Sequence, residues 1–291
     1  MNYLVTYKKQ QQWAAAVRID DMIIDLQEAG WRGGVITSVK QIIEENAVDK
    51  AIDHARRAFT AGQVSGRSID SLELGPVITN PGKILCVGAN YRAHLEEADY
   101  PAPAFPEVFG KYANTLIGPH AEIPLTSASA QVDYEGELAV IIGKKGKNIP
   151  YAQALDHVAG YAVANDISAR DIQLRVSQWI VGKSMDGFLP IGPGLVPASA
   201  IPSPYGLRIQ TKLNGRVMQD SSTDLLIFNI HHIISFLSDY MTLEPGDIIC
   251  TGTPGGVGLY CDPPIFLQND DEISVEIEGL GVICNRAKRI N

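Results

Sequence analysis

The sequence is poor in basic residues and has no long apolar segment. Lysine and arginine number 24 against 33 aspartates and glutamates, so the formal net charge is −9 and no basic surplus is present to neutralise nucleic-acid phosphates. No apolar run reaches the roughly 18 residues of a membrane span, and the chain does not open with a secretory signal pattern. We therefore expect a cytoplasmic protein with neither a nucleic-acid nor a membrane partner.

Cysteine is also scarce. Cys86, Cys250, Cys261 and Cys284 show no CxxC spacing, and in a long chain without a signal peptide we expect free thiols rather than disulfides. Internal repeats and low-complexity segments are missing. Hydrophobic residues make up 45% and charged residues 20%, which is ordinary for a globular protein and argues against disorder.

The hydrophobic patterns predict more strands than helices. We predict helices at residues 39–59, 91–98 and 229–240, and strands at residues 3–7, 14–19, 22–25, 83–87, 133–143, 157–165, 194–197, 207–213, 216–219, 247–251, 272–277 and 282–289. Asn214-Gly215 is a strong hairpin signal. The turn at residues 80–82 marks a boundary, so we predict a small α/β N-terminal domain at 1–78 and a β-dominated α+β domain at 79–291, not a doubly wound sheet.

Acidic residues alternate along the predicted strand at residues 133–143. Asp133, Glu135 and Glu137 lie two residues apart, and such residues share one face of a strand. Because the second half of this strand is apolar and should be buried, three like charges there repel and resist desolvation. A hard cation removes this problem, and oxygen ligands suit Mg²⁺, Mn²⁺ or Ca²⁺. The alternative is a solvated strand face that carries acids.

Asp166 is a candidate for a further carboxylate at the same site. It follows the apolar run at 157–165, where a predicted strand meets a loop, and polar groups in such places are common in active sites. The alternative is that Asn165 or Asp166 caps the next helix. The spacing leaves both interpretations open.

His94 and Glu97 are three residues apart in the predicted helix and so share one face. The carboxylate orients the imidazole, which makes the pair a candidate general base for activating water. A surface His–Glu pair is the alternative.

Glycines surround two further candidates. Lys183 lies between Gly182 and Gly187, which let backbone and substrate approach closely, so this lysine is a candidate for binding a substrate carboxylate or an enolate oxygen. A solvated lysine is the alternative. The loop at 251–258 fits neither phosphate-loop nor dinucleotide patterns, so we expect it to bind a carboxylate through hydroxyls and amides, or to be an ordinary turn.

Five segments, in this order, closely resemble the fumarylacetoacetate hydrolase family. They are CVGANYRAHLEE at 86–97, DYEGELA at 133–139, NDISARDIQ at 165–173, QWIVGK at 178–183 and GDIICTGTP at 246–254. The resemblance runs from about residue 81 to the C-terminus and favours the branch of 2-hydroxyhepta-2,4-diene-1,7-dioate isomerases and acylpyruvate hydrolases. Residues 1–78 are similar, more loosely, to the small leading domain of bacterial-type members.

The resemblance implies roles for particular residues. It implies that the metal ligands are Glu135, Glu137 and Asp166, with Asp133 supporting them. It implies that the catalytic residues are His94, Glu97 and Lys183. It implies that substrate contacts come from Gln173, Arg170, Thr253 and Lys111.

The resemblance also implies a mixed β-roll, a homodimer and a divalent cation, Mg²⁺ or Mn²⁺ with Ca²⁺ as an alternative. The expected substrate is a small 2-oxo acid. We expect hydrolysis of a C–C bond in an acylpyruvate-type β-diketo acid, because the water-activating dyad is complete. The alternatives are isomerisation or tautomerisation, or decarboxylation of an oxaloacetate-like acid, at the same site, and, less favoured, a non-catalytic binding protein.

Overall fold

Strands form most of the regular structure in the computed structural model, which describes residues 2–290. The helices are α1 (Val39–Glu44), α2 (Val48–Thr60), α3 (Arg92–Glu97), α4 (Arg170–Gln173), α5 (Ile180–Lys183) and α6 (Ile230–Tyr240). The strands are β1 (Tyr3–Lys9), β2 (Gln12–Ile19), β3 (Met22–Asp25), β4 (Arg67–Ser68), β5 (Ile84–Gly88), β6 (Glu107–Lys111), β7 (Leu116–Ile117), β8 (Ile123–Leu125), β9 (Val132–Asp133), β10 (Gly136–Ile142), β11 (Val158–Asn165), β12 (Ser168–Ala169), β13 (Leu189–Pro197), β14 (Arg208–Leu213), β15 (Arg216–Ser222), β16 (Ile248–Cys250), β17 (Glu272–Ile277) and β18 (Gly281–Arg289). The prediction of a β-dominated α+β chain is confirmed.

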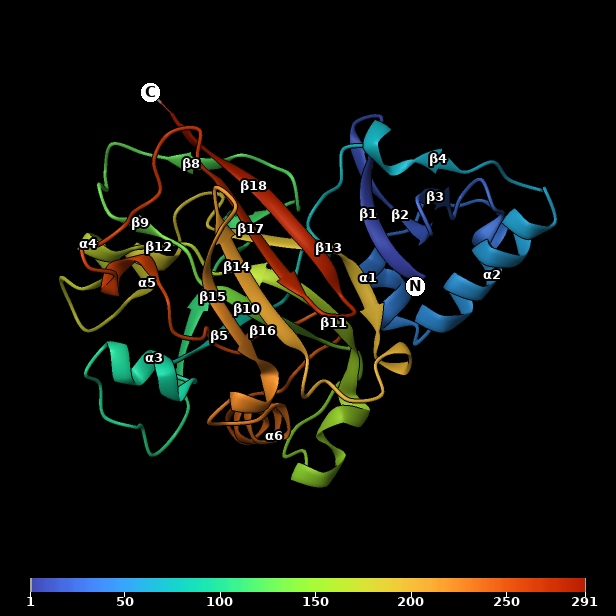
Figure 1. Ribbon diagram of the computed structural model, residues 1–291. Helices are drawn as coiled ribbons and strands as arrows, with labels where there is room; N and C mark the ends of the chain where they lie inside the picture. The colour runs from blue at the N-terminus through green and yellow to red at the C-terminus, as the bar shows by residue number, and fades with distance from the viewer. Residues whose placement is uncertain (1, 291) are drawn as a thin grey trace.

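Two sheets packed face to face build the large body of the molecule (Figure 1). The main sheet has the order β4-β3-β2-β1-β13-β11-β10-β16-β5-β6, with β7 beside β13, and the second has the order β15-β14-β17-β18-β8. The main sheet is mixed, since β16 pairs with β10 antiparallel and with β5 parallel. The core between the sheets joins Leu138 and Val140 of β10 to Ile209 of β14 and Val275 of β17.

The N-terminal strands form a smaller lobe that extends the main sheet. β1 pairs with β13 at Leu4 and Leu195, and β2 to β4 follow it outward. In Figure 1 this lobe, coloured blue, lies beside the large body. One hydrophobic cluster contains Leu4 and residues of α1 and α2 together with Leu189 of β13, so the lobe and the body share a core. The domain boundary at residue 78 stays a prediction.

The long helix that we predicted at residues 39–59 is two helices. Ser38 caps the start of α1: its hydroxyl accepts a hydrogen bond from the Gln41 amide, and the Gln41 side chain accepts one from the Ser38 amide. Asn46 then adopts a left-handed conformation with φ of 51°, which ends the first helix before α2 starts. Helical spacing continues across this break, so periodicity alone does not reveal it.

The strand that we predicted at residues 133–143 is also interrupted. β9 ends at Asp133 and pairs with β12, whereas β10 begins at Gly136. The premise of one continuous strand was therefore wrong, and the alternation argument does not place Asp133 with the two glutamates. Glycine is required at 136, because a Cβ there would lie 2.3 Å from the Thr211 hydroxyl oxygen of β14.

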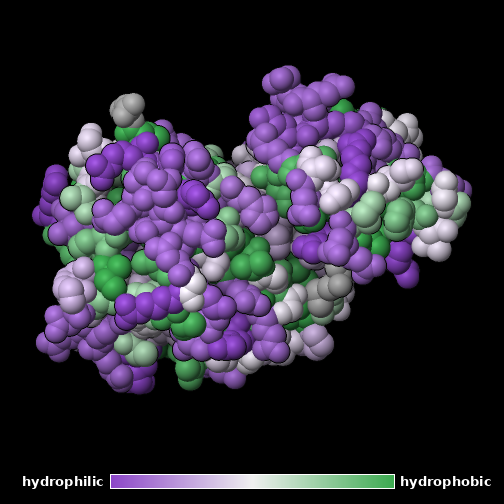
Figure 2. Space-filling model, turned by 45° about the horizontal axis from the view of Figure 1, so that its top comes forward, coloured by the Kyte–Doolittle hydropathy of each residue, from purple (hydrophilic) through white to green (hydrophobic). Residues whose placement is uncertain are grey.

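Other local predictions are confirmed. The β14–β15 hairpin turns through Asn214 and Gly215, both with positive φ, as an Asn-Gly turn requires. All four cysteines are free thiols. Within residues 2–290, the structure contains no helix with the length and hydropathy needed to cross a bilayer. Figure 2 shows hydrophilic residues over much of the face in view, with hydrophobic residues in smaller groups.

Candidate metal and active site

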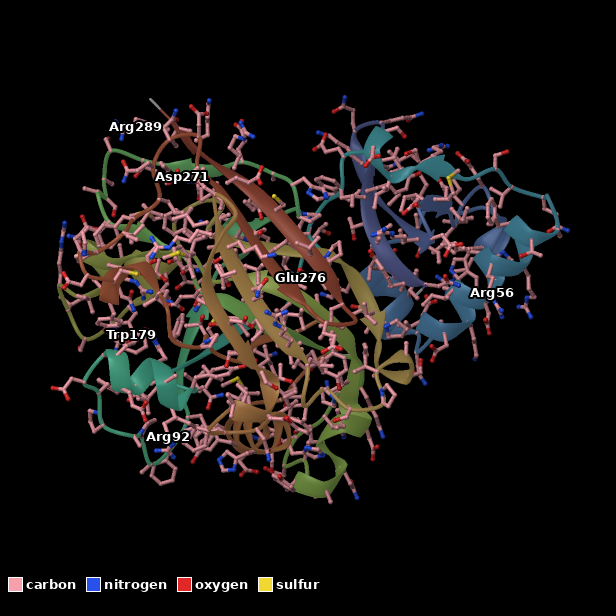
Figure 3. All side chains as sticks on the ribbon, viewed as in Figure 1. Arg56, Arg92, Trp179, Asp271, Glu276 and Arg289 are labelled. Carbon is pink, nitrogen blue, oxygen red and sulfur yellow. The ribbon has the colours of Figure 1, made fainter. Side chains whose placement is uncertain are left out.

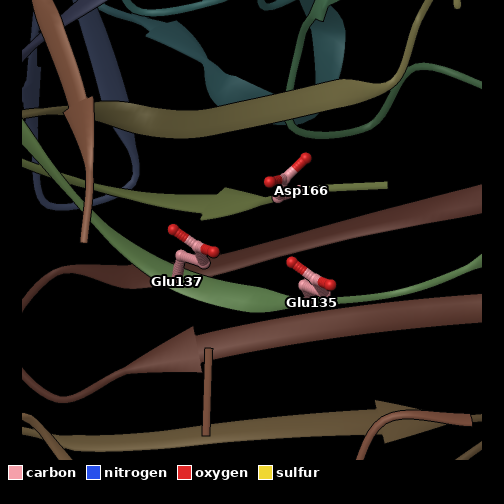
Figure 4. A group of neighbouring side chains, drawn as sticks. All are labelled: Glu135, Glu137 and Asp166. Carbon is pink, nitrogen blue, oxygen red and sulfur yellow. The ribbon is translucent and has the colours of Figure 1, made fainter. Parts of the chain in front are cut away.

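Three carboxylates converge where β10 and β11 pair. Glu135 precedes β10, Glu137 is its second residue, and Asp166 directly follows β11. Because Gly136 pairs with Asn165, these two strand ends lie side by side. Each carboxylate offers an oxygen within 4.8 Å of the others, and all three side chains are buried. Figure 4 shows the three side chains as neighbours. The sequence-predicted ligand set is thus brought together.

Buried cations neutralise two of the three carboxylates. The Lys183 ammonium lies 2.7 Å from Glu135 Oε2 and 3.0 Å from Asp166 Oδ2. Lys111 donates to the other oxygen of Asp166, and Arg170 Nη1 donates to Glu135 Oε1 at 2.6 Å. Burial raises the pKa of Glu135, but the charges of Lys183 and Arg170 outweigh it and hold that pKa at about 2.

Glu137 lacks such a partner. Among residues 2–290 its side chain accepts one hydrogen bond, from the Gly252 amide at 2.8 Å, and it forms no ion pair. Burial, together with the neighbouring Cys250, Asp166 and Glu135, raises its pKa well above the usual range. A buried carboxylate without a cation is costly, so this oxygen set fits a hard divalent ion bound by Glu135, Glu137 and Asp166.

The formal charges around the site support this fit. Four buried carboxylates, the three above and Asp133, face three buried cations, Lys111, Lys183 and Arg170. With all four carboxylates ionised, as a bound metal requires of its ligands, the cluster is one negative charge in excess, and a divalent ion makes it one positive charge in excess. A site of that charge attracts an anionic substrate.

The predicted dyad is formed and is tied to the glycine-rich loop. His94 Nδ1 lies 2.7 Å from Glu97 Oε1, and Glu97 Oε2 accepts a hydrogen bond from the Gly256 amide at 2.7 Å. Since an ionised carboxylate only accepts hydrogen bonds, Nδ1 of His94 carries the proton, and Nε2 is the basic nitrogen. The Tyr260 ring packs against His94, with ring centroids 6.1 Å apart.

A cavity of about 120 Å³ connects His94 of the dyad with Glu135 and Glu137. Its polar lining consists of His94, Glu135, Glu137, Arg170, Gln173, Lys183 and Thr253, with Tyr100 and Glu107 at other places on the wall. The remaining lining is mostly apolar and consists of Val87, Gly88, Ala89, Leu95, Ala98, Phe109, Leu174, Trp179, Leu259 and Tyr260. The volume lies below the roughly 300 Å³ at which pockets for drug-sized ligands begin, so the cavity suits a small acid.

Lys111 occupies a different place from the one that we expected. It is not among the residues that line the cavity, and its ammonium donates to Asp166 and to the Ile167 carbonyl oxygen. Its side chain is completely buried. Lys111 therefore holds a carboxylate of the site, and its position does not support a substrate contact.

The other expected substrate contacts differ in whether they still have a hydrogen-bond donor available for a substrate. The Thr253 hydroxyl donates a hydrogen bond to the Gly136 carbonyl oxygen and accepts one from the Gln219 amide nitrogen. It therefore has no free proton to donate to a substrate. Gln173 accepts a hydrogen bond from Arg170 at 3.2 Å through its oxygen, which leaves its amide nitrogen as a donor. Arg170 Nη2 is buried and has no partner among residues 2–290.

Asp133 anchors the loop that closes the cavity. Its carboxylate accepts hydrogen bonds from Arg170 Nε at 2.9 Å, from the Gly258 amide at 2.9 Å and from the Leu259 amide at 3.0 Å. The next residue along, Tyr260, lies against His94. One buried carboxylate thus fixes both the arginine and this loop.

Sequence reasoning missed the aromatic wall of the cavity. Trp179, labelled in Figure 3, meets Phe109 edge to face with centroids 5.5 Å apart, and the Lys183 ammonium lies 5.0 Å from the Phe109 ring centroid. A Cβ at Gly88 would lie 2.7 Å from the Trp179 ring, so glycine there makes room for it. Gly88 and Trp179 belong to the segments that resemble the family, but Phe109 lies outside them, and no pattern in the sequence indicates its place.

Comparisons with known proteins agree with this architecture. Residues 83–288 match the model of the fumarylacetoacetate hydrolase C-terminal domain. The human protein named oxaloacetate tautomerase FAHD2A, mitochondrial, is 42% identical over 271 residues, which is 89% of this chain and 85% of that one. The solved structure of fumarylacetoacetate hydrolase from Exiguobacterium antarcticum matches with a TM-score of 0.84 and 32% identity over the whole of both chains.

A further structural match contains a metal ion. Maleylpyruvate hydrolase from Sphingobium sp. SYK-6, in complex with manganese(II) and pyruvate, has a TM-score of 0.80 and 26% identity over 99% of this chain and 100% of that one. Isomerases are also among the matching solved structures. Hydrolase and isomerase chemistry thus both occur on this fold.

The expectation of a cytoplasmic protein is contradicted by the relatives. Human and bovine proteins that match over most of this chain carry the word mitochondrial in their names. The expectation rested on the pattern at the start of the sequence, and that pattern does not decide the compartment.

Proposed function

The chain belongs to the fumarylacetoacetate hydrolase family of enzymes, and from this premise we propose that it is a divalent-metal-dependent tautomerase of short 2-oxo acids such as oxaloacetate. Tautomerisation was our alternative to C–C hydrolysis. The name of the human relative, at 42% identity, supports it over hydrolysis. The proposed ions are Mg²⁺ and Mn²⁺, which suit three carboxylate oxygens.

The observation that carries the proposal is one small cavity with a base at one side and acidic ligands at the other. His94 lines it together with Glu135 and Glu137. We propose that Glu135, Glu137 and Asp166 hold the divalent ion. When bound, this ion supplies Lewis-acid stabilisation for negative charge that develops on the substrate.

His94 carries out the proton transfer. In the keto-to-enol direction its Nε2 takes a proton from C3 of the 2-oxo acid, and Glu97 stabilises the resulting imidazolium through Nδ1. The electron pair of the broken C–H bond becomes the C2–C3 double bond, and the C2 oxygen gains the negative charge. A proton returned from His94 to this oxygen completes the enol, so one proton leaves carbon and one is added to oxygen.

Three groups are in place to bind the negative oxygen atoms of the substrate. The Lys183 ammonium donates two of its three hydrogens to Glu135 and Asp166, so one remains for a substrate oxygen. The Gln173 amide nitrogen and Arg170 Nη2 are the other donors. A preorganised donor of this kind contributes about 3–4 kcal/mol to transition-state stabilisation when it acts on a developing oxyanion.

Hydrolysis of an acylpyruvate stays a prediction and is the second candidate. The dyad favours it, because His94 oriented by Glu97 is also suited to deprotonate water. Hydrolysis needs a water molecule beside the substrate as a second reactant, whereas tautomerisation needs none.

The proposal is tested by following the enol absorbance of oxaloacetate with and without Mn²⁺. We expect the protein with Mn²⁺ to accelerate the approach to keto–enol equilibrium, and His94→Asn to remove most of this effect. His120→Asn is the matched control, since His120 is exposed and lies outside the cavity. No acceleration by the metal-loaded protein contradicts the proposal. Pyruvate release from oxaloacetate or from an acylpyruvate identifies decarboxylation or hydrolysis instead.

The homodimer implied by the family resemblance stays a prediction. Light scattering on the purified protein tests it directly.

A further inference from the structure

The inner face of β6 runs along the cavity from its metal end to its far end. Glu107, Phe109 and Lys111 alternate along this strand, so they share a face, with steps of about 6–7 Å. Lys111 donates to the proposed ligand Asp166, and the ring of Phe109 faces the Lys183 ammonium. Glu107 lies one step further and pairs with Gly88 of β5. Glu107 therefore lines the cavity two steps along β6 from Lys111, away from the carboxylates, and this part of the cavity is called its far end.

Glu107 is half-buried and incompletely bonded in the cavity wall. Its Oε1 accepts a hydrogen bond from the Tyr100 hydroxyl at 2.9 Å. Its Oε2 is buried and has no hydrogen-bond partner among residues 2–290. Gly88, Trp179 and other apolar residues line the cavity around it. A buried acceptor without a partner is costly, and a ligand that donates a hydrogen bond removes this cost.

The two ends of the cavity differ in charge compensation. At the metal end, Glu135 and Asp166 pair with Lys183, and Arg170 adds a further cation. In the described part of the chain, Glu107 forms no ion pair. The far end thus presents a negative charge that nothing nearby neutralises, and a second negative charge placed there is repelled.

We infer that Glu107 is a specificity-determining residue that selects the tail of the substrate. It favours 2-oxo acids whose tail ends in a hydrogen-bond donor such as a hydroxyl, and it disfavours tails of the same length that end in a carboxylate. Short acids that stop near Phe109 do not reach it, so a four-carbon diacid is unaffected. This inference rests on the proposed function for the position of the substrate head at the carboxylates.

The test is a comparison of two 2-oxo acids with matched length and different ends. Binding of 2-oxoadipate and of 6-hydroxy-2-oxohexanoate to the Mn²⁺-loaded protein is measured by calorimetry, with oxalate as a probe of the head site. We expect the hydroxy acid to bind the wild-type protein more tightly by on the order of tenfold or more, the factor that corresponds to about 1.4 kcal/mol. Oxalate binding reports whether the head site is intact.

The variant Glu107→Gln keeps the shape of the side chain and removes its charge. We expect it to bring the two dissociation constants close together, chiefly through tighter binding of 2-oxoadipate, while oxalate binds as before. Glu96→Gln is the matched control, because Glu96 is exposed and does not line the cavity. An unchanged ratio in Glu107→Gln, or the same change in Glu96→Gln, overturns the inference.

Failure of the inference and failure of the proposed function give different results. If the wild-type protein accelerates oxaloacetate tautomerisation but Glu107→Gln leaves the binding ratio unchanged, only the inference is wrong. If the ratio changes as expected but oxaloacetate tautomerisation is not accelerated, the tail selection stands and the proposed reaction is wrong.

Discussion

Replacing Asp133 by asparagine tests whether this carboxylate holds the wall of the cavity together. Asp133 is completely buried, and its two oxygens accept hydrogen bonds from Arg170 Nε and from the amides of Tyr134, Gly258 and Leu259. Asp133→Asn preserves the size of the side chain. It removes the charge and turns one acceptor into a donor that faces other donors.

The expected loss of stability follows from these contacts. Breaking a buried ion pair by removing one partner costs about 3–5 kcal/mol. Arg170 keeps Glu135 as a second partner at 2.6 Å, and asparagine keeps one accepting oxygen, so the loss falls at the lower end. We therefore expect the free energy of unfolding to decrease by about 3 kcal/mol. Because the loop at Gly258 and Leu259 loses its anchor, kcat/KM should fall as well.

Denaturant titration of the wild-type protein and Asp133→Asn measures this difference. Asp270→Asn is the matched control, since Asp270 lies at the surface and pairs with Lys288, and exposed pairs contribute little. A loss below about 1 kcal/mol, the value of a single ordinary hydrogen bond, would show that Asp133 does not anchor this wall. Equal losses in both variants would refute the reasoning in the same way.

Three further changes have defined outcomes. His94→Asn should lower kcat by about 10²–10⁴-fold and leave Mn²⁺ binding unchanged, as measured by steady-state kinetics and calorimetry; an equal loss of Mn²⁺ binding contradicts the base assignment. Mn²⁺ at about one hundred times its dissociation constant should stabilise the wild-type protein by about 2.7 kcal/mol in thermal unfolding and stabilise Glu137→Gln much less; equal stabilisation places the ion elsewhere. Burial raises the pKa of Asp25, but hydrogen bonds from Lys9 and Tyr7 outweigh it and lower that pKa, so Asp25 stabilises the fold above its unfolded pKa of about 3.9. The stability difference between wild type and Asp25→Asn should thus be present at neutral pH and disappear as the pH falls below about 4, and a difference that persists in acid denaturation curves is the contrary result.

Local signals explain the successful fold predictions. The Asn214-Gly215 turn was predictable because only residues that tolerate positive φ fit it, and no distant contact is involved. The meeting of Glu135 and Glu137 with Asp166 followed from motif order, which carries information that the spacing of any one motif lacks. The same motifs identified the His94–Glu97 pair, whose hydrogen bond lies within one helix turn.

Predictions failed where long-range contacts decide the structure. The interruption after Asp133 depends on pairing with β12 and on the close approach of β14 to Gly136, and alternation of acidic and other residues does not report either. The contact of Lys111 with Asp166 was not predictable either, because the two residues are 55 positions apart in sequence. The pairing of Leu4 with Leu195 likewise joins the lobe to the body through a contact that no local pattern indicates.

The central claim is that Glu135, Glu137 and Asp166 bind one divalent ion. Anomalous diffraction at the manganese edge, from crystals of the full chain grown with Mn²⁺ and oxalate, tests it most directly. We expect a single strong anomalous peak within coordinating distance of all three carboxylates, with oxalate beside it. A peak at another place, or no peak between these side chains, would contradict the account.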